Sequence, residues 1–139
     1  MDSHFFIAPG YWFECDGYDT VKEVGDDWVL MSHINTRIPK SRLIPILITR
    51  KFLIDNGFKP TDDGYIYRMS SHTRNSDYIF IQFDINDGIR VCEISRNFSS
   101  NGKFHRRLYF VHELQHIMIA FGFGDKAFDL KLNYNPFID

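Results

Sequence analysis

The stretch from Arg106 to Phe121, RRLYFVHELQHIMIAF, constrains the fold most, because it is the longest uninterrupted segment with the apolar spacing of a helix. At about 100° per residue, one face of this helix collects Phe110, Leu114, Ile117 and Phe121. Leu108 and Ile119 lie on the opposite side. A helix that is apolar nearly all round is buried on both sides. The segment therefore predicts a long C-terminal helix enclosed by the fold or by a partner.

The same helix carries the pentapeptide HELQH, which fits the HExxH pattern of zinc peptidases. Residues i and i+4 of a helix point the same way, so His112 and His116 are candidate ligands of one zinc ion, with Glu113 as the candidate general base. A catalytic zinc also needs a third protein ligand, and Asp125 and Asp129 are the candidates. This set predicts a zinc-dependent hydrolase or peptidase as an alternative function.

Other features favour a structural role for this helix. The metzincin extension requires Gly at position 119 and His at position 122, where this chain has Ile119 and Gly122. His105 is seven residues before His112, roughly 10 Å along a helix axis, which is too far for one ion. A pattern with three fixed letters also arises by chance. We therefore expect neutral histidines that pack or hydrogen bond, and no catalytic residue or cofactor.

The N-terminal third predicts a small β module over about residues 1–45. Pro9-Gly10 and Asp16-Gly17 are turn signals. Thr20–Val24 and Trp28–Ser32 have the composition of strands, and the Gly25-Asp26-Asp27 turn between them suits a hairpin.

A short helix follows this module. Thr49 has the side chain of an N-cap, Arg50–Asn56 has helical spacing with Phe52 and Leu53 inward, and Gly57 is a stop signal.

The middle of the chain predicts an antiparallel sheet. Tyr65–Met69 and Tyr78–Ile85 alternate between apolar and polar residues. Asn86-Asp87-Gly88 is the clearest hairpin turn and leads back into Ile89–Ser95. The whole chain, residues 1–139, is thus expected to be one α+β domain. After the N-terminal module, residues of about 46–139 form the short helix, the central sheet and a long C-terminal helix packed on that sheet.

The composition points to binding through aromatic side chains. Aromatic residues make up 17% of the chain, with 14 Phe and 7 Tyr, which is enough for a core and an interface. The net charge of −2 carries no general signature of nucleic-acid binding. Basic residues still gather at Arg37, Lys40, Arg42, Arg50 and Lys51, and again at Lys103, His105, Arg106 and Arg107. A solvated surface is the favoured interpretation of the first group, and nucleic-acid binding through either group is a weaker alternative.

The cysteines and the N-terminus predict a cytoplasmic protein. Cys15 and Cys92 stand far apart and belong to no CxxC pair, so we expect free thiols in a reducing compartment. Residues Met1 to His4 lack the basic region of a signal peptide. No apolar run approaches the length of about 18 residues that spans a bilayer, so no membrane partner is expected.

Two blocks of the chain carry a resemblance to known proteins. The first is the run IPILIT at residues 44–49, followed by Phe52-Leu53 and the NGF of residues 56–58, and the second is the run YFVHELQH at residues 109–116. They resemble the "IPLT, helix, GF" block and the C-terminal "YVHQLQNLY" signature of a family of small uncharacterised proteins found widely in Bacteroidetes genomes and their phages. The two blocks cover about a quarter of the chain. The family has no established activity.

The resemblance bears on the zinc motif. The family signature has Gln at the position of Glu113 and Asn at that of His116, so it contains neither the base nor the second ligand. The two patterns share His112, Leu114 and Gln115, which implies a structural helix whose His and Gln side chains satisfy local hydrogen bonds. The chain departs from the family at Arg50 and Lys51, where acidic residues would be expected.

These observations favour a non-enzymatic accessory protein of a phage or mobile element. It would act in the host cytoplasm by binding a macromolecular partner, most simply another protein or a second copy of itself. The zinc hydrolase and the nucleic-acid-binding protein are the alternatives.

Overall fold

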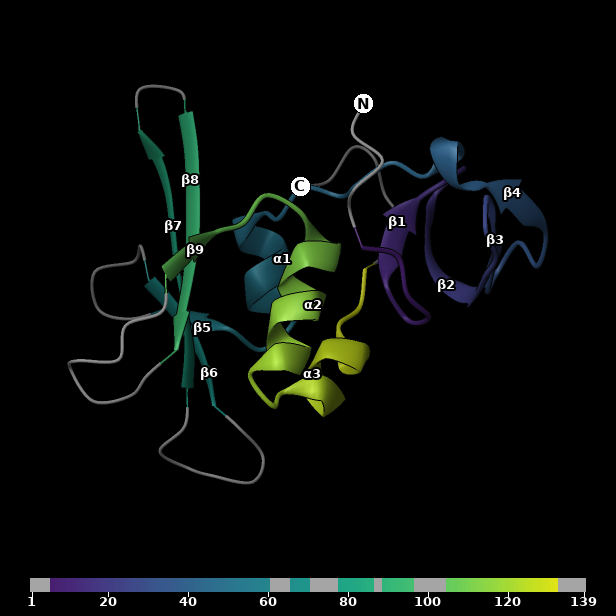
Figure 1. Cartoon of the computed structure of the whole chain (residues 1–139). Coiled ribbons are helices and arrows are strands. Elements are labelled where there is room, and N and C mark those ends of the chain that lie inside the picture. Colours follow the sequence, from purple (N-terminus) through teal and green to yellow (C-terminus); the bar gives the residue numbers. More distant parts are fainter. Residues whose placement is uncertain (1–5, 61–65, 71–77, 87–88, 97–104, 133–139) are drawn as a thin grey trace. The chain divides into compact units, whose positions relative to one another are not determined.

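The computed structural model describes residues 6–60, 66–70, 78–86, 89–96 and 105–132 (Figure 1). The chain divides into two compact units. The first combines Met1–Leu47 with Phe110–Asp139, and the second is Ile48–Tyr109. The boundary after Leu47 lies close to the expected change at residue 45. The C-terminal helix belongs to the same unit as the N-terminal strands, whereas the sequence analysis grouped it with the central sheet.

The first unit contains a four-stranded antiparallel sheet. Its strands, in the order β1-β2-β3-β4, are Trp12–Glu14, Tyr18–Val24, Trp28–Met31 and Arg37–Pro39 (Figure 1). Asp16 and Gly17 both have positive φ, which allows the tight turn between β1 and β2. The β2–β3 hairpin around Gly25-Asp26-Asp27 confirms the sequence prediction.

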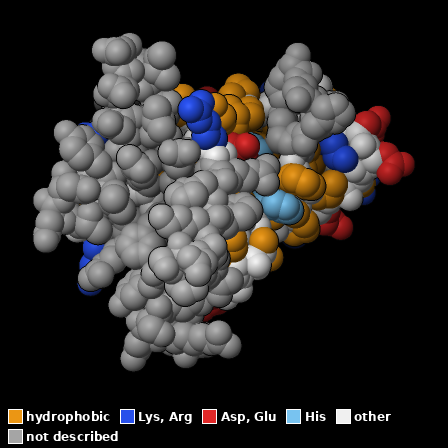
Figure 2. All heavy atoms as spheres, turned by 60° about the vertical axis from the view of Figure 1, so that its left-hand side comes forward, with side chains coloured by type: hydrophobic (Ala, Val, Ile, Leu, Met, Phe, Trp, Pro, Cys, Tyr) orange, Lys and Arg blue, Asp and Glu red, His pale blue; other side chains and the backbone are white. Residues whose placement is uncertain are grey.

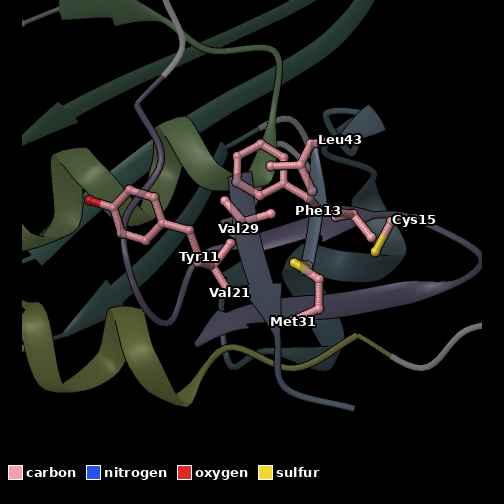
Figure 3. Packing of buried hydrophobic residues seen from close by; sticks show 8 residues of the cluster. Tyr11, Phe13, Cys15, Val21, Val29, Met31 and Leu43 are labelled. Atoms are coloured by element: carbon pink, nitrogen blue, oxygen red, sulfur yellow. The ribbon is translucent and has the colours of Figure 1, made fainter. Parts of the chain in front are cut away.

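One face of this sheet forms a buried core, shown in Figure 3. The buried residues are Tyr11, Phe13, Cys15, Val21, Val29, Met31, Ile38 and Leu43. Their alternation along the strands follows the period of two that an antiparallel sheet with one buried face requires. Cys15 is a free, buried thiol as expected, and burial raises its pKa, with the charges of Asp19 and Asp16 acting in the same direction.

The C-terminal helix is shorter than the sequence predicts. Helix α2 spans Val111–Ala120, whereas the apolar periodicity began at Arg106. The first residues of that stretch belong instead to strand β9, His105–Arg107, which pairs with a neighbouring strand. The backbone N–H of Val111 donates to the carbonyl of Ile46, and Leu47 forms an isolated bridge with Phe110. These backbone pairings hold the chain extended up to the first residue of α2.

Two short helical elements complete the first unit. The 3-10 helix η1 spans Lys40–Arg42 directly after β4. Helix α3 spans Gly124–Asp129 and packs against α2. Gly122, with φ of 88°, ends α2 and allows the sharp turn into α3. Both α2 and α3 thus lie in the unit that holds the first sheet.

The second unit contains a helix and a five-stranded antiparallel sheet in the order β5-β6-β7-β8-β9. The elements before β9 are α1 (Arg50–Asp55), β5 (Lys59–Pro60), β6 (Ile66–Ser70), β7 (Tyr78–Asn86) and β8 (Ile89–Arg96). Ile79 and Ile81 on β7 are fully buried, as their alternation predicts. The side chain of Cys92 and the predicted turn residues Asp87 and Gly88 lie outside the described part of the chain.

Helix α1 confirms the signals read from its sequence. The hydroxyl oxygen of Thr49 accepts from the backbone N–H of Phe52 over 3.0 Å, which is the expected N-cap. Phe52 and Leu53 are buried. Gly57 follows with φ of 88°, a conformation that favours glycine. Local capping chemistry is therefore sufficient to place this helix.

The observed elements confirm the α+β class. Among the residues that the structure describes, no helix is both long and apolar enough to cross a membrane.

Candidate functional site

The carboxylate of Glu113 caps the N-terminus of α2. Its Oε1 accepts a hydrogen bond from the backbone N–H of Phe110 over 3.0 Å. This contact satisfies one of the N–H groups that a helix leaves without an intrahelical partner, and a negative charge in the first turn also suits the helix dipole. The candidate general base of the zinc motif thus has a structural task in this arrangement.

The imidazole of His112 is packed among aromatic rings. His112 is only 1% exposed. Its ring centre lies 4.7 Å from that of Phe13 and 5.9 Å from that of Phe110, and both pairs are stacked. Burial lowers the pKa of His112 to about 4, and the nearby His116 acts in the same direction. His112 is therefore neutral at physiological pH, as the sequence analysis expected.

The imidazole of His116 is held by two residues of the N-terminal segment. Its Nδ1 lies 3.0 Å from the hydroxyl of Tyr11. Phe6 stacks on the same ring, with centres 4.1 Å apart and planes 9° from parallel. The hydroxyl of Tyr11 is thus within hydrogen-bonding distance of one ring nitrogen of His116, and the ring of Phe6 covers one face of the imidazole.

Gln115, between the two histidines, makes the most extensive polar contacts of the motif. It is fully buried. Its Oε1 accepts from the backbone N–H of Trp12 over 2.9 Å, and its Nε2 donates to the carbonyls of Gly10 and Ala127 over 2.9 and 3.1 Å. The sequence analysis expected local hydrogen bonds for this side chain, but these partners belong to β1, to the preceding turn and to α3. The amide joins segments that are far apart in the chain.

The other proposed zinc ligands do not gather with the histidines. Asp125 and Asp129 lie on α3. Among the described residues, no group of three or more His, Cys, Asp or Glu side chains is placed to hold a metal ion. In the structure, His112 and His116 fit a packing role better than a ligand role, because aromatic rings lie against both. The zinc site stays an alternative prediction.

The first basic cluster is divided between the two units. Arg37, Lys40 and Arg42 belong to the first unit, and Arg50 and Lys51 to the second. The side chains of the first group contact other groups of their own unit. The guanidinium of Arg37 lies 4.1 Å from the centre of the Trp28 ring, Lys40 donates to the carbonyl of Asp26, and Arg42 lies 3.7 Å from the carboxylate of Asp16.

In the second unit, Lys51 pairs with Asp55 one helical turn later, with Nζ 2.6 Å from Oδ2. Arg107, at the end of β9, is exposed. The side chain of Arg106 is outside the described part of the structure. Within each unit, the described basic side chains thus contact different partners, and nucleic-acid binding stays an alternative prediction.

The β3–β4 edge carries a hollow that the sequence analysis did not predict. Its volume is about 280 Å³, and it is lined by Asp27, Trp28, Arg37, Ile38 and Pro39. The guanidinium of Arg37 lies over the indole of Trp28, and the indole also packs against Gly25, where a Cβ would overlap the ring. The sequence analysis predicted a strand at Trp28 but none at Arg37, and the observed β3–β4 pairing brings the two side chains together.

A second polar cluster surrounds Asp19 on β2. Asp19 is 2% exposed, and its carboxylate accepts from the backbone N–H groups of Thr20, His33 and Ile34. The Nδ1 of His33 lies 3.0 Å from Oδ1 of Asp19, while the His33 side chain is 83% exposed. The buried carboxylate therefore fixes the turn that follows β3.

The chain was compared with models of known protein families, with curated proteins and with solved structures, and none of them matches. Its function therefore has to follow from its own side chains and their contacts.

Proposed function

We propose that this chain is a non-enzymatic accessory protein, of phage or mobile-element type, that works in the host cytoplasm by binding another protein. The observation that carries this proposal is the number of large apolar side chains left exposed on the first unit. They are Phe6, Val24, Ile34, Ile44, Leu47, Ile119 and Phe128. Figure 2 shows hydrophobic side chains at the surface among the described residues. Aromatic and aliphatic groups of this kind form the centre of protein interfaces.

Two exposed phenylalanines are the strongest anchors. Phe6 is 56% exposed although it stacks on His116, and Phe128 is 54% exposed although it packs over Gly10. A Cβ at Gly10 would lie 2.6 Å from the Phe128 ring, so the ring rests directly on the backbone. A phenylalanine offers roughly 150–250 Å² of surface, and covering the remaining half would contribute about 2 kcal/mol per ring. Two such rings are enough to give an interface a centre.

A second exposed pair lies on the segment that precedes α1. Ile44 and Leu47 are 53% and 50% exposed. The backbone of Ile44 pairs with Glu14, and that of Leu47 pairs with Phe110, so both residues are held in position by isolated bridges. Ordered backbone under an exposed apolar side chain lowers the entropy cost of binding.

The contacts of the HELQH segment support a binding protein over a hydrolase. Glu113 bonds the backbone of Phe110, and the rings of His112 and His116 stack on phenylalanines. A catalytic zinc site needs three protein ligands and an open position for water. In the structure these three side chains serve helix capping and packing.

The test compares the double variant Phe6→Ser/Phe128→Ser with the control Lys22→Ser. Lys22 is exposed on β2 of the same unit, so its substitution tests for a general surface effect. Self-association is measured by analytical ultracentrifugation. Partner capture is measured by retention of host and phage proteins on immobilised full-length chain. We expect the double variant to lose the captured protein or the dimer, and Lys22→Ser to keep it.

Two outcomes would contradict the proposal. One is a wild-type chain that stays monomeric and retains no protein from host or infected-cell lysate. The other is capture that the double variant and the control reduce equally, since the exposed phenylalanines would then not be the anchors.

A further inference from the structure

Strand β4 forms one edge of the first sheet, and its side chains differ on the two faces. In the described part of the chain it pairs only with β3. Ile38 is buried in the core, while Arg37 and Pro39 are exposed on the opposite face. A strand edge with unpaired backbone groups is a template for another extended segment.

The register decides which backbone groups point outward. The N–H of Lys40 donates to the carbonyl of Asp27, which makes these two residues a hydrogen-bonded pair. Such pairs alternate along an antiparallel ladder, so Ile38 directs its backbone groups toward β3. Arg37 and Pro39 direct theirs toward the outer edge. The edge thus offers the N–H and carbonyl of Arg37 and the carbonyl of Pro39, because proline has no N–H to donate.

The side chain of Arg37 is ordered beside this edge by stacking on Trp28. Its guanidinium lies 4.1 Å from the centre of the Trp28 ring, and Trp28 in turn rests on Gly25. Within the described residues Arg37 has no ion-pair partner, whereas Arg42 is close to Asp16. A stacked guanidinium still presents its N–H edge for a bidentate contact with a carboxylate. The stack therefore orders a cation without using its donors.

The hollow beside Arg37 has room for one side chain of a partner. Its volume of about 280 Å³ lies near the lower end of the range of ligand pockets, roughly 300–1,000 Å³. Trp28, Ile38 and Pro39 supply apolar walls. Asp27 also lines the hollow, and its carboxylate would repel the continuous negative charge of a nucleic-acid backbone. A peptide with a single acidic side chain avoids most of that repulsion.

From these observations we infer that the β3–β4 edge is a docking site for an extended, acidic segment of a partner protein. The segment pairs its backbone with Arg37 and directs an Asp or Glu carboxylate to the Arg37 guanidinium. An apolar residue two positions away, on the same face of the segment, enters the hollow against Trp28. This inference rests on the proposed protein-binding function and names one surface and one chemistry for it.

The test uses the capped hexapeptide Thr-Val-Thr-Glu-Thr-Val as the probe, with Thr-Val-Thr-Gln-Thr-Val and Thr-Val-Thr-Lys-Thr-Val as matched peptides. Each is titrated into isotope-labelled full-length protein, and the backbone and indole N–H signals are followed by NMR. We expect only the Glu peptide to bind, with shifts at Arg37 and at the Trp28 indole. Arg37→Gln should weaken it about tenfold, and Arg42→Gln, which removes the same charge outside the hollow, should leave it unchanged.

Three results would overturn the inference. The first is equal binding of the three peptides, and the second is an equal loss of Glu-peptide binding in Arg37→Gln and Arg42→Gln. The third is tighter binding of a single-stranded oligothymidine that Arg37→Gln weakens, which would assign the edge to nucleic acid. Failure of the proposed function can be distinguished from failure of this inference. If the peptide does not bind but partner capture that depends on Phe6 and Phe128 persists in Arg37→Gln, the protein-binding function is retained and the β4 docking site is rejected.

Discussion

The side-chain carbonyl of Gln115 accepts a hydrogen bond of 2.9 Å from the backbone N–H of Trp12, which lies 103 positions earlier in the chain. The same amide donates to the carbonyl of Gly10. A side-chain amide thus pairs with the edge of β1 at Trp12 much as a neighbouring strand would, next to the position where Glu14 pairs with Ile44. This contact makes α2 part of the first unit and gives the HELQH segment a structural role.

Replacing Gln115 should therefore destabilise the protein strongly. Gln115→Leu removes three hydrogen bonds and leaves the backbone groups of Trp12, Gly10 and Ala127 without this partner. We expect the free energy of unfolding to fall by about 3 kcal/mol. Urea denaturation monitored by circular dichroism measures it. Gln115→Glu is the sharper variant, because it sets a carboxylate oxygen against two carbonyl oxygens at unchanged size. A loss below about 0.5 kcal/mol, the level of an ordinary surface substitution, would refute the structural role.

Acid should weaken the fold through His112. Burial holds the pKa of His112 near 4 in the folded protein, below the value of about 6.5 in an unfolded chain. A histidine whose pKa is lowered by folding contributes its full stabilisation above about pH 6.5, where it is neutral in both the folded and the unfolded state. As the pH falls, the unfolded state takes up the proton first, so stability is lost between about pH 6.5 and 4. The expected loss is about 3 kcal/mol.

Urea titrations at pH 7.5, 5.5 and 4.5 measure this dependence. His112→Leu should remove most of the slope, whatever its effect on stability at neutral pH. Lys22→Leu is the control for an ordinary surface substitution, because that side chain is exposed on β2. Equal slopes for wild type and His112→Leu would show that another group governs the acid response.

Gly25 should be required for the position of Trp28. A Cβ at Gly25 would overlap the indole, so Gly25→Ala must displace the ring from its place under Arg37. We expect a loss of about 1–2 kcal/mol, together with a changed indole N–H signal of Trp28 by NMR. Gly124→Ala is the matched control, because its nearest side-chain atom, in Ile119, would be 3.9 Å away. An unshifted Trp28 signal in Gly25→Ala would contradict the stacking argument.

Metal content distinguishes the proposed function from the hydrolase alternative. Protein purified without a histidine tag or chelator should carry no stoichiometric zinc by elemental analysis, because Tyr11 and Phe6 already contact the His116 ring. His116→Ala should then change nothing, and His33→Ala controls for adventitious binding by an exposed histidine. About one zinc per chain, lost only in His116→Ala, would make the hydrolase the leading function and justify a peptidase screen.

Local chemistry determined what could be predicted from the sequence by itself. The Thr49 cap and the Gly57 stop placed α1, and the Gly25-Asp26-Asp27 turn placed the β2–β3 hairpin, because each signal acts within a few residues. The alternation of Ile79 and Ile81 likewise indicated a strand with one buried face. These elements need no knowledge of distant parts of the chain.

Tertiary contacts decided the rest. The apolar periodicity from Arg106 predicted one long helix, but strand pairing took His105–Arg107 into β9. Backbone hydrogen bonds with Ile46 and Ile48 held the chain extended up to Val111. Periodicity cannot weigh a helical turn against a ladder whose partner strand is distant in sequence. The same limit applies to the Gln115 contacts and to the Trp28–Arg37 stack. Both depend on which segments become neighbours, and that is settled only when the whole fold buries its apolar faces.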